Sequence, residues 1–297
     1  MKDNNPLVSI LTNTYNRCDL IHRCIESIQN QSYKNYEHII VDGNSTDETE
    51  TVVKAYNDPR IKYIKLDTRG PEVQMKAGSA IAKGKYVTFL DDDDEYMPNK
   101  LEKQVALFET EPDEVGVVYC WMSYYNNDKP DVVINVHKTE LKGDVSVIAP
   151  TRPLVCGTPT MMIRRDVFEK VGGAYDDSYG YIGSDWELMT RVCQLCQVDY
   201  VPESLVKVYV NHGHARLSTD FYQDKARKGI VFHNHFLNEY SEVFKKYPKS
   251  ADFHYSSLCK CYATLKERKN AFKYWKLYLG TKPTFKKSLV LLRDIFF

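Results

Sequence analysis

The chain has 297 residues, of which 43% are hydrophobic and 27% are charged. This composition is typical of a globular protein with a sizeable core, and it excludes a fibrous or wholly disordered chain. Lysine plus arginine equals aspartate plus glutamate at 40 each, which argues against a general nucleic-acid-binding surface.

The even charge balance conceals a difference between two parts of the chain. Residues 1–220 carry a net charge of −10, and residues 221–297 carry +10. A basic C-terminal tail indicates contact with something anionic, either a membrane surface or the acidic part of the same chain, and both alternatives stay open. Because the sequence shows neither a secretory signal nor a run of roughly 18 apolar residues, we expect a cytoplasmic protein, with peripheral contact at the inner face of the membrane as an option.

Strand and helix patterns alternate through the first 125 residues. Strands are predicted at 7–13, 36–42, 61–66, 85–90 and 116–125, and helices at 19–31, 45–57, 71–82 and 98–110. Ser45 is the expected N-cap of the second helix, and Pro71 the expected first residue of the third. This alternation predicts an α/β fold, with a mostly parallel sheet flanked by helices and ligands bound beyond the carboxyl ends of its strands.

The rest of the chain is less regular. Residues 126–160 predict loops and an edge ribbon; a strand with a short helix closed by glycine follows at 160–173, then a helix at 184–195 and two strands at 198–202 and 205–210. From residue 221 the pattern is helical to the end. We therefore expect a catalytic domain over residues 1–218 and a C-terminal α-helical region over residues 219–297.

The eight cysteines read as reduced thiols of a cytosolic protein. A structural zinc site built from Cys193, Cys196, Cys259 and Cys261 is the less favoured alternative to ordinary buried thiols.

Polar residues follow three of the predicted strands, at Asn13–Arg17, Asp42–Asp47 and Asp91–Asp94. The run Asp91–Asp94 suits Mg²⁺ or Mn²⁺, because these cations select carboxylate oxygens and usually complete their shell with substrate phosphates. The alternative is a solvated acidic turn in which Asp94 caps the next helix. The sequence contains neither G-x-G-x-x-G after the first strand nor G-x-x-x-x-G-K-[ST], which argues against a dinucleotide-binding Rossmann domain and a P-loop enzyme.

Four segments in this order resemble the motifs of a family 2 glycosyltransferase with the GT-A fold, and the resemblance extends over about residues 6–218. They are VSILTNTYNR (8–17), YEHIIVDGNSTDET (36–49), AKGKYVTFLDDDD (82–94) and YGYIGSDWELMTRV (179–192). The resemblance implies an inverting, metal-dependent enzyme that moves a sugar from a nucleotide-sugar, expected to be a UDP-sugar, to an acceptor hydroxyl. The implied task is synthesis of a surface polysaccharide, glycolipid or glycoprotein glycan, with a glycan or lipid-linked acceptor.

The resemblance also implies roles for individual residues. Asp185 matches the catalytic base, and Mn²⁺ or Mg²⁺ is expected on Asp91, Asp93 and His212. The expected contacts of the nucleotide-sugar are Asn13, Tyr15, Arg17, Asp42, Arg69, Lys76, Asp91 and Asp92, with Asp42 at the position that contacts the base.

The chain departs from the family pattern in three places. Asn13 replaces a usual proline, Asp42-Gly43 replaces a frequent pair of aspartates, and Met75-Lys76 replaces a frequent Arg-Asn pair. Lys76 or Arg69 is expected to supply the charge that the missing arginine would have carried.

Two other functions fit the sequence less well. A nucleotidyltransferase that makes nucleotide-sugars needs a glycine-rich and basic phosphate loop after the first strand, and NTYNRCD contains only Arg17 as a cation. A non-catalytic scaffold or glycan-binding protein with a transferase fold is disfavoured because Asp91, Asp93 and Asp185 are all present.

Overall fold

The computed structural model describes residues 5–155, 157–173, 183–211, 213 and 222–296. The chain divides into two compact units that each draw on several segments. Unit 1 comprises Met1–Ser146, Leu154–Tyr175 and Asp185–Gly213, and unit 2 comprises Val147–Pro153, Asp176–Ser184 and His214–Phe297. The simpler boundary after residue 218 stays a prediction.

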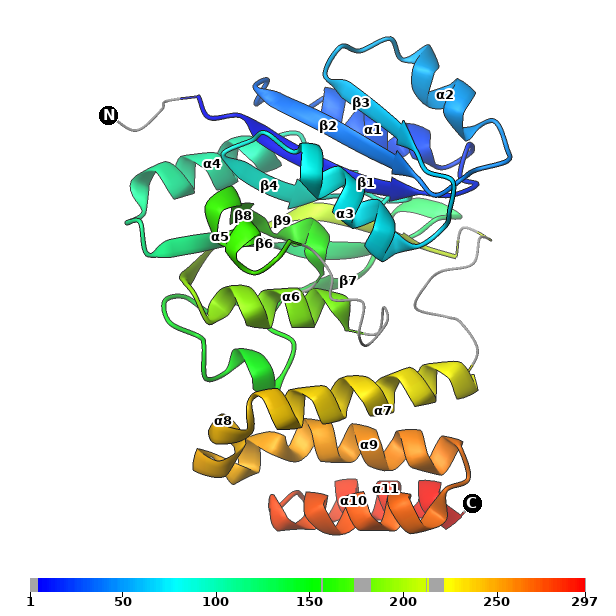
Figure 1. Ribbon diagram of the computed structural model, residues 1–297, viewed down its shortest axis with the longest axis vertical. Helices are drawn as coiled ribbons and strands as arrows, with labels where there is room; N and C mark the ends of the chain where they lie inside the picture. The colour runs from blue at the N-terminus through cyan, green and yellow to red at the C-terminus, as the bar shows by residue number, and fades with distance from the viewer. Residues whose placement is uncertain (1–4, 156, 174–182, 212, 214–221, 297) are drawn as a thin grey trace. The chain divides into compact units, whose positions relative to one another are not determined.

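Unit 1 is built on a nine-stranded sheet with the order β3-β2-β1-β4-β8-β6-β9-β5, and β7 pairs with β6. Its strands are β1 (Val8–Thr14), β2 (Tyr36–Asp42), β3 (Ile61–Lys65), β4 (Tyr86–Phe89), β5 (Glu95–Tyr96), β6 (Val115–Asn126), β7 (Lys129–His137), β8 (Met162–Arg164) and β9 (Gln197–Val210). The pairs β1–β2, β2–β3, β1–β4 and β6–β9 are parallel, whereas β5, β7 and β8 pair antiparallel with their neighbours. The prediction of a mostly parallel α/β sheet is confirmed (Figure 1).

Helices cover both faces of this sheet (Figure 1). Those of unit 1 are α1 (Ile21–Gln29), α2 (Thr49–Ala55), α3 (Pro71–Ile81), α4 (Lys100–Thr110), α5 (Arg165–Lys170) and α6 (Ser184–Cys193). On one face Ile10 of β1 shares a buried cluster with Ile28 of α1 and Leu101 of α4. Successive strand residues point to opposite faces, and Leu11 accordingly lies beside α3, where a Cβ added to Gly78 would be 3.5 Å from its Cδ2 atom. Both faces of β1 are therefore buried, as expected of a central parallel strand.

The helix α2 begins at Thr49, so the prediction of Ser45 as its N-cap is wrong. The Ser45 hydroxyl instead accepts a hydrogen bond from the backbone N–H of Asn16, at 2.8 Å. Asp47 accepts from the N–H of Thr49 at 3.0 Å. The Ser45 hydroxyl therefore bonds to the distant Asn16 and does not cap the helix that follows it. Pro71 does begin α3, as predicted.

The two strands predicted at 198–202 and 205–210 form one strand, β9. In its pairing with β6, Val201 lies opposite Cys120 and Ser204 lies opposite the next residue, Trp121. Pro202 and the residue after it therefore lie outside the ladder. Proline has no N–H to donate, and a bulge at this point lets the strand continue without losing a ladder hydrogen bond.

Lys100 is fully buried beneath the sheet at the start of α4. Its Nζ atom donates to the Thr88 hydroxyl at 3.1 Å and lies 3.9 Å from the centre of the Tyr96 ring. Burial lowers the pKa of Lys100 to about 7. In the unfolded chain the pKa of this amine is about 10.4, so the amine stays protonated up to about that pH. The unfolded chain therefore binds the proton more tightly than the folded chain does.

We expect the Lys100→Met variant to be more stable than the parent at pH 7. In the parent, folding at this pH buries an amine that is charged in the unfolded chain, and the variant avoids this cost. Between pH 7 and pH 10 the parent should regain on the order of 4 kcal/mol, because the folded chain has released the proton of Lys100 over this range while the unfolded chain still binds it, and this advantage of the unfolded chain shrinks as the pH rises. Urea unfolding at pH 7, 8.5 and 10 measures the difference between variant and parent. The exposed Lys83→Met variant is the control, and a difference for Lys100→Met that stays constant with pH would contradict the prediction.

Unit 2 contains the helices α7 (Tyr222–Glu239), α8 (Ser241–Lys246), α9 (Asp252–Thr264), α10 (Arg268–Gly280) and α11 (Phe285–Phe296), which confirms the helical pattern predicted from residue 221. Cys259, Ala271, Tyr278, Leu291 and Ile295 form a buried cluster among α9, α10 and α11. None of the described helices combines the length and the apolar character that crossing a bilayer requires.

A pair of buried histidines joins the helices of unit 2 to the segment Val147–Pro153. His254 Nε2 lies 2.8 Å from the carbonyl oxygen of Pro150, so this nitrogen carries the proton and donates. His254 Nδ1 then accepts from His233 Nδ1, which is 3.1 Å away. Burial lowers the pKa of His233 to about 3 and that of His254 to about 4, so both rings are neutral at pH 7.

Candidate active site

The carboxyl ends of β1, β2 and β4 lie at a common edge of the sheet. In the parallel register Thr14 lies opposite Asp42, and Leu11 lies opposite Phe89. The acidic run begins at Asp91, shortly after β4 ends at Phe89. The three polar segments singled out in the sequence are therefore neighbours in space, as parallel strands require.

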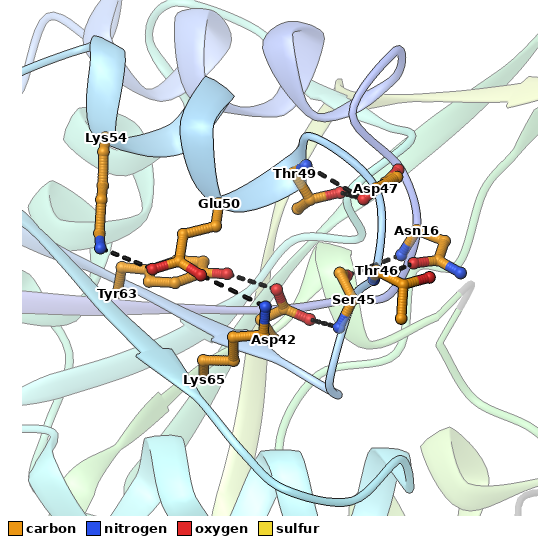
Figure 2. A network of polar contacts seen from close by, with 10 residues as sticks. All are labelled: Asn16, Asp42, Ser45, Thr46, Asp47, Thr49, Glu50, Lys54, Tyr63 and Lys65. Atoms are coloured by element: carbon orange, nitrogen blue, oxygen red, sulfur yellow. Dashed lines mark hydrogen bonds and ion pairs between the residues drawn. The ribbon is translucent and has the colours of Figure 1, made fainter.

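The loops after β1 and β2 are bound to each other by hydrogen bonds that the sequence did not predict (Figure 2). The N–H of Asn16 donates to Ser45, and the N–H of Thr46 donates to the side-chain oxygen of Asn16, both at 2.8 Å. The N–H of Arg17 donates to the Thr49 hydroxyl at 3.1 Å. Asn16 adopts a φ of 50°, a left-handed conformation that asparagine tolerates better than most residues. Asn44 in the loop after β2 also adopts a left-handed conformation, with a φ of 69°, so one asparagine marks each of the joined loops.

Asp42 is fully buried, and both of its carboxylate oxygens accept hydrogen bonds from the protein (Figure 2). The N–H of Ser45 donates to Oδ1 at 2.7 Å, and the Tyr63 hydroxyl donates to Oδ2. Burial and this bond to Asp42 raise the pKa of Tyr63, so the phenol stays protonated as the donor. Asp42 therefore shapes the loop after β2, and its contact with a nucleotide base stays a prediction.

Gln74 accounts for the glycine found where a second aspartate was expected. Its Nε2 atom donates to the carbonyl oxygens of Thr14 and Val41, both at 2.9 Å, and so ties α3 to the ends of β1 and β2. A Cβ added to Gly43 would lie 2.8 Å from Gln74 Oε1. The amide side chain thus occupies the space that an aspartate at position 43 would need.

We expect Gly43→Asp to destabilise the chain by about 1–3 kcal/mol, the usual cost of overpacking a tightly filled site. Adding Gln74→Ala should recover part of this loss, because it empties the space next to position 43. Urea unfolding of the parent, both single variants and the double variant measures the coupling. Strictly additive effects would show that the two positions do not compete for one space.

Three of the predicted nucleotide-sugar contacts meet at the start of α3. The guanidinium carbon of Arg69 lies 4.2 Å from the centre of the Tyr15 ring. Asn13 Nδ2 donates to the carbonyl oxygen of Pro71 at 3.1 Å. Lys76 lies further along α3 and is exposed to solvent, as is Arg69. An aromatic ring and one cation, Arg69, therefore border the carboxyl end of β1.

Asp91, Asp93 and Asp94 form the one group of three or more potential metal ligands found in the described part of the chain, which contains no such group of cysteines. Their carboxylate oxygens lie within 4.8 Å of one another. Three hard oxygen donors at this spacing fit Mg²⁺ or Mn²⁺. Asp92, between them, is buried.

Asp94 does not cap the next helix, whose N-cap position is held by Asn99. It instead accepts a hydrogen bond from the N–H of Tyr209 in β9, at 3.0 Å. Arg17 Nη1 lies 3.4 Å from Asp93 Oδ2, so the loop after β1 brings a positive charge to the acidic run. His212, the other predicted metal ligand, lies outside the described residues.

Asp185 lies in the first turn of α6, where the Thr158 hydroxyl donates to its Oδ1 atom at 3.2 Å. The backbone N–H of Thr158 also bonds to this carboxylate. Burial raises the pKa of Asp185, and the two hydrogen bonds from Thr158 act against that rise. Sequence reasoning missed Thr158, since no local pattern marks a bond between residues 27 positions apart.

The turn that holds Asp185 lies at the same sheet edge as the acidic run. Thr158 begins a short 3₁₀ turn, Thr158–Thr160, just before β8. Because β8 runs antiparallel to β4, with Met162 opposite Thr88, the residues that precede β8 lie at the carboxyl end of β4. Asp91 follows β4 directly in the sequence, and Asp185 is held near the same end of β4 by its hydrogen bond with Thr158.

Known sequences resemble the part of the chain that forms most of the sheet and the acidic run. The family model described as Glycosyl transferase family 2 matches residues 9–172. An uncharacterised glycosyltransferase of Rickettsia prowazekii is 31% identical over 229 residues, which cover 74% of this chain and 69% of the relative. The Escherichia coli protein WfaP, named UDP-Glc:α-D-GlcNAc-diphosphoundecaprenol β-1,3-glucosyltransferase, is 31% identical over 176 residues, covering 59% of this chain and 67% of WfaP.

Solved structures share the fold at low sequence identity. Residues 1–349 of Staphylococcus aureus TarS, in complex with UDP-GlcNAc, superpose with a TM-score of 0.66 at 14% identity, covering 93% of this chain and 91% of that one. The mannosyltransferase PcManGT of Pyrobaculum calidifontis, in complex with GDP-Man and Mn²⁺, gives 0.61 at 18% identity, covering 97% and 79%. The sheet of unit 1 is accordingly a GT-A sheet. With its family model matched over more than half of its length, the chain belongs to glycosyl transferase family 2 and is a nucleotide-sugar-dependent glycosyltransferase.

Proposed function

We propose that this enzyme is an inverting, metal-dependent glycosyltransferase that uses a UDP-sugar and a lipid-linked or glycan acceptor in surface polysaccharide or glycolipid synthesis. The proposal rests on the acidic group Asp91, Asp93 and Asp94 at the carboxyl end of β4. Thr158 holds Asp185 at the same edge of the sheet by a hydrogen bond. The name of WfaP supports a UDP-sugar and a lipid diphosphate acceptor, and the bound UDP-GlcNAc of TarS supports the same nucleotide.

The donor end of the site is built from carboxylates and cations. Asp91 and Asp93, with His212, would hold Mn²⁺ or Mg²⁺, which when bound neutralises negative charge on the nucleoside diphosphate. Arg17, next to Asp93, adds positive charge at the same place. Tyr15 offers a ring face to the nucleotide, and Arg69 lies on this ring.

The acceptor end of the site is built around Asp185. A carboxylate within hydrogen-bond reach of the acceptor hydroxyl takes its proton as the oxygen attacks the anomeric carbon. One base is sufficient for a single displacement, which inverts that carbon. Thr158 fixes Oδ1, and Gly157 leaves room beside Oδ2, since a Cβ there would lie 3.5 Å from this oxygen. Burial makes Asp185 a stronger base than an exposed aspartate.

Calorimetric titration of the parent with UDP and with GDP, each with and without Mn²⁺, tests the donor and the metal together. We expect UDP to bind more tightly than GDP, and only when Mn²⁺ is present. Tighter binding of GDP would keep the enzyme class and overturn the UDP assignment. Equal binding of UDP without any divalent metal would overturn metal dependence, and the absence of any nucleotide binding would favour the non-catalytic scaffold.

A further inference from the structure

The last helix of unit 2, α11, presents apolar side chains to solvent as well as to the protein. Leu291 and Ile295 are buried in the cluster with α9 and α10. On the exposed side Phe285 is 78% accessible, Leu289 47% and Val290 42%. Phe285 is the most exposed large hydrophobic residue in the described part of the chain.

This arrangement differs from that of an ordinary surface helix, which carries polar residues opposite its buried stripe. Six described residues of α11 are exposed, and they divide evenly between apolar and basic side chains: Phe285, Leu289 and Val290, and Lys286, Lys287 and Arg293. At 100° per residue Phe285 and Leu289 lie within about 40° of each other, and Lys286 is about 60° beyond Leu289. Apolar side chains and cations therefore share one surface.

One of the three cations on this surface is paired, and the two lysines form no ion pair within the described part of the chain. Arg293 pairs with Asp294 at 3.0 Å. Neither Lys286 nor Lys287 has an acidic partner among the residues that the structure describes. Lys282, just before the helix, is also exposed. These cations belong to the region of residues 221–297, which carries a net charge of +10.

We propose that the exposed face of α11, formed by Phe285, Lys286, Lys287, Leu289 and Val290, docks on an anionic lipid surface. Apolar side chains that enter the headgroup region, flanked by lysines that attract anionic lipids, are the two features that such binding requires. A second copy of the chain fits this face less well, because a symmetric interface would bring two sets of like charges together. The 12-residue helix is about 18 Å long, too short to cross the roughly 30 Å hydrocarbon core, so it lies on the membrane.

Vesicle flotation with the full chain tests the proposal, using pure phosphatidylcholine and phosphatidylcholine with phosphatidylglycerol. We expect binding only to the anionic vesicles, weakened by salt. Phe285→Ser with Leu289→Ser, and Lys286→Glu with Lys287→Glu, should each lower the bound fraction at least about tenfold. All four side chains are exposed, so both variants are expected to fold, which thermal unfolding verifies.

Two control variants match these changes at other exposed positions. Leu195→Ser with Val231→Ser removes two exposed apolar side chains, and Arg227→Glu with Lys249→Glu reverses two exposed charges. Both should float like the parent. No binding of the parent to anionic vesicles would overturn the proposal, as would equal binding by the α11 variants. If the parent does not bind vesicles but forms a dimer in solution, and only Phe285→Ser with Leu289→Ser dissociates that dimer, the face binds a second copy of the chain instead. The assay contains neither nucleotide nor sugar, so its outcome is independent of the proposed donor chemistry.

Discussion

Replacing Asp93 with asparagine is expected to lower Mn²⁺-dependent UDP affinity and sugar transfer by on the order of 100-fold or more. Asparagine keeps the size of the side chain and removes the negative charge, so the acidic group loses a charged donor for a divalent cation. Losing one main source of electrostatic stabilisation in an active site has an effect of this size. Calorimetry with UDP and Mn²⁺ measures the affinity, and a transfer assay with a UDP-sugar measures the rate.

The control for Asp93→Asn is Asp131→Asn, which makes the same chemical change at an exposed position on β7. Asp93 also faces Arg17, so the free energy of unfolding of both variants is measured in parallel. We expect higher Mn²⁺ concentrations to restore part of the activity of Asp93→Asn. A variant that binds UDP and metal like the parent would show that Asp93 is not a ligand.

Replacing Asp185 with asparagine is expected to lower turnover by about 10²–10⁴-fold while UDP affinity in the presence of Mn²⁺ stays at the parent level. The amide oxygen can still accept the hydrogen bond from the Thr158 hydroxyl, which holds the side chain at the helix start, but the side chain can no longer take a proton. Single-turnover transfer and UDP calorimetry on the same preparation separate the two effects. A proportional loss of UDP binding would place Asp185 in the donor site instead.

Thr158→Val provides a graded companion to this experiment, because it removes the hydroxyl bond and leaves the carboxylate. Hydrogen bonds to a carboxylate lower its pKa, so losing one should raise the pKa of Asp185. The base works when deprotonated, and the acidic limb of the pH profile of kcat/KM should therefore move to higher pH. Thr158→Ser should restore the parent profile. An unchanged profile in Thr158→Val would show that the hydroxyl does not influence the base.

The sequence predicted the elements of unit 1 well where local patterns and buried parallel strands coincide. The strand β2 occupies the predicted residues 36–42, and Pro71 begins α3. The errors occur where a distant contact prevails over the local pattern. Ser45 resembles an N-cap, but its hydroxyl binds Asn16, 29 positions earlier. Asp94 resembles one as well, but it binds the backbone of Tyr209, which lies 115 positions later.

The candidate site shows the same limit. Asp93 is a candidate because a carboxylate run follows a strand, and Asp185 is a candidate through the family resemblance; the roles of both stay predictions. Thr158 and Gln74 could not be predicted, because their roles depend on bonds to Asp185 and to the carbonyl of Thr14, 27 and 60 positions away. The sequence shows Gly43 as a departure from a frequent aspartate, and the position of Gln74 in the structure gives the physical reason for the glycine.

The attachment of Val147–Pro153 to unit 2 has a consequence for how such enzymes can be recombined. Its Pro150 carbonyl accepts the hydrogen bond of the buried His254 in α9, so part of the packing of the C-terminal helices comes from the middle of the chain. In a chimera that exchanges only the residues after 213 between two relatives, His254 would pack against the Val147–Pro153 segment of the other protein and lose the segment of its own. We therefore expect an exchange of the C-terminal helices to keep this hydrogen bond only when Val147–Pro153 is transferred with them, or when the segment of the recipient already matches.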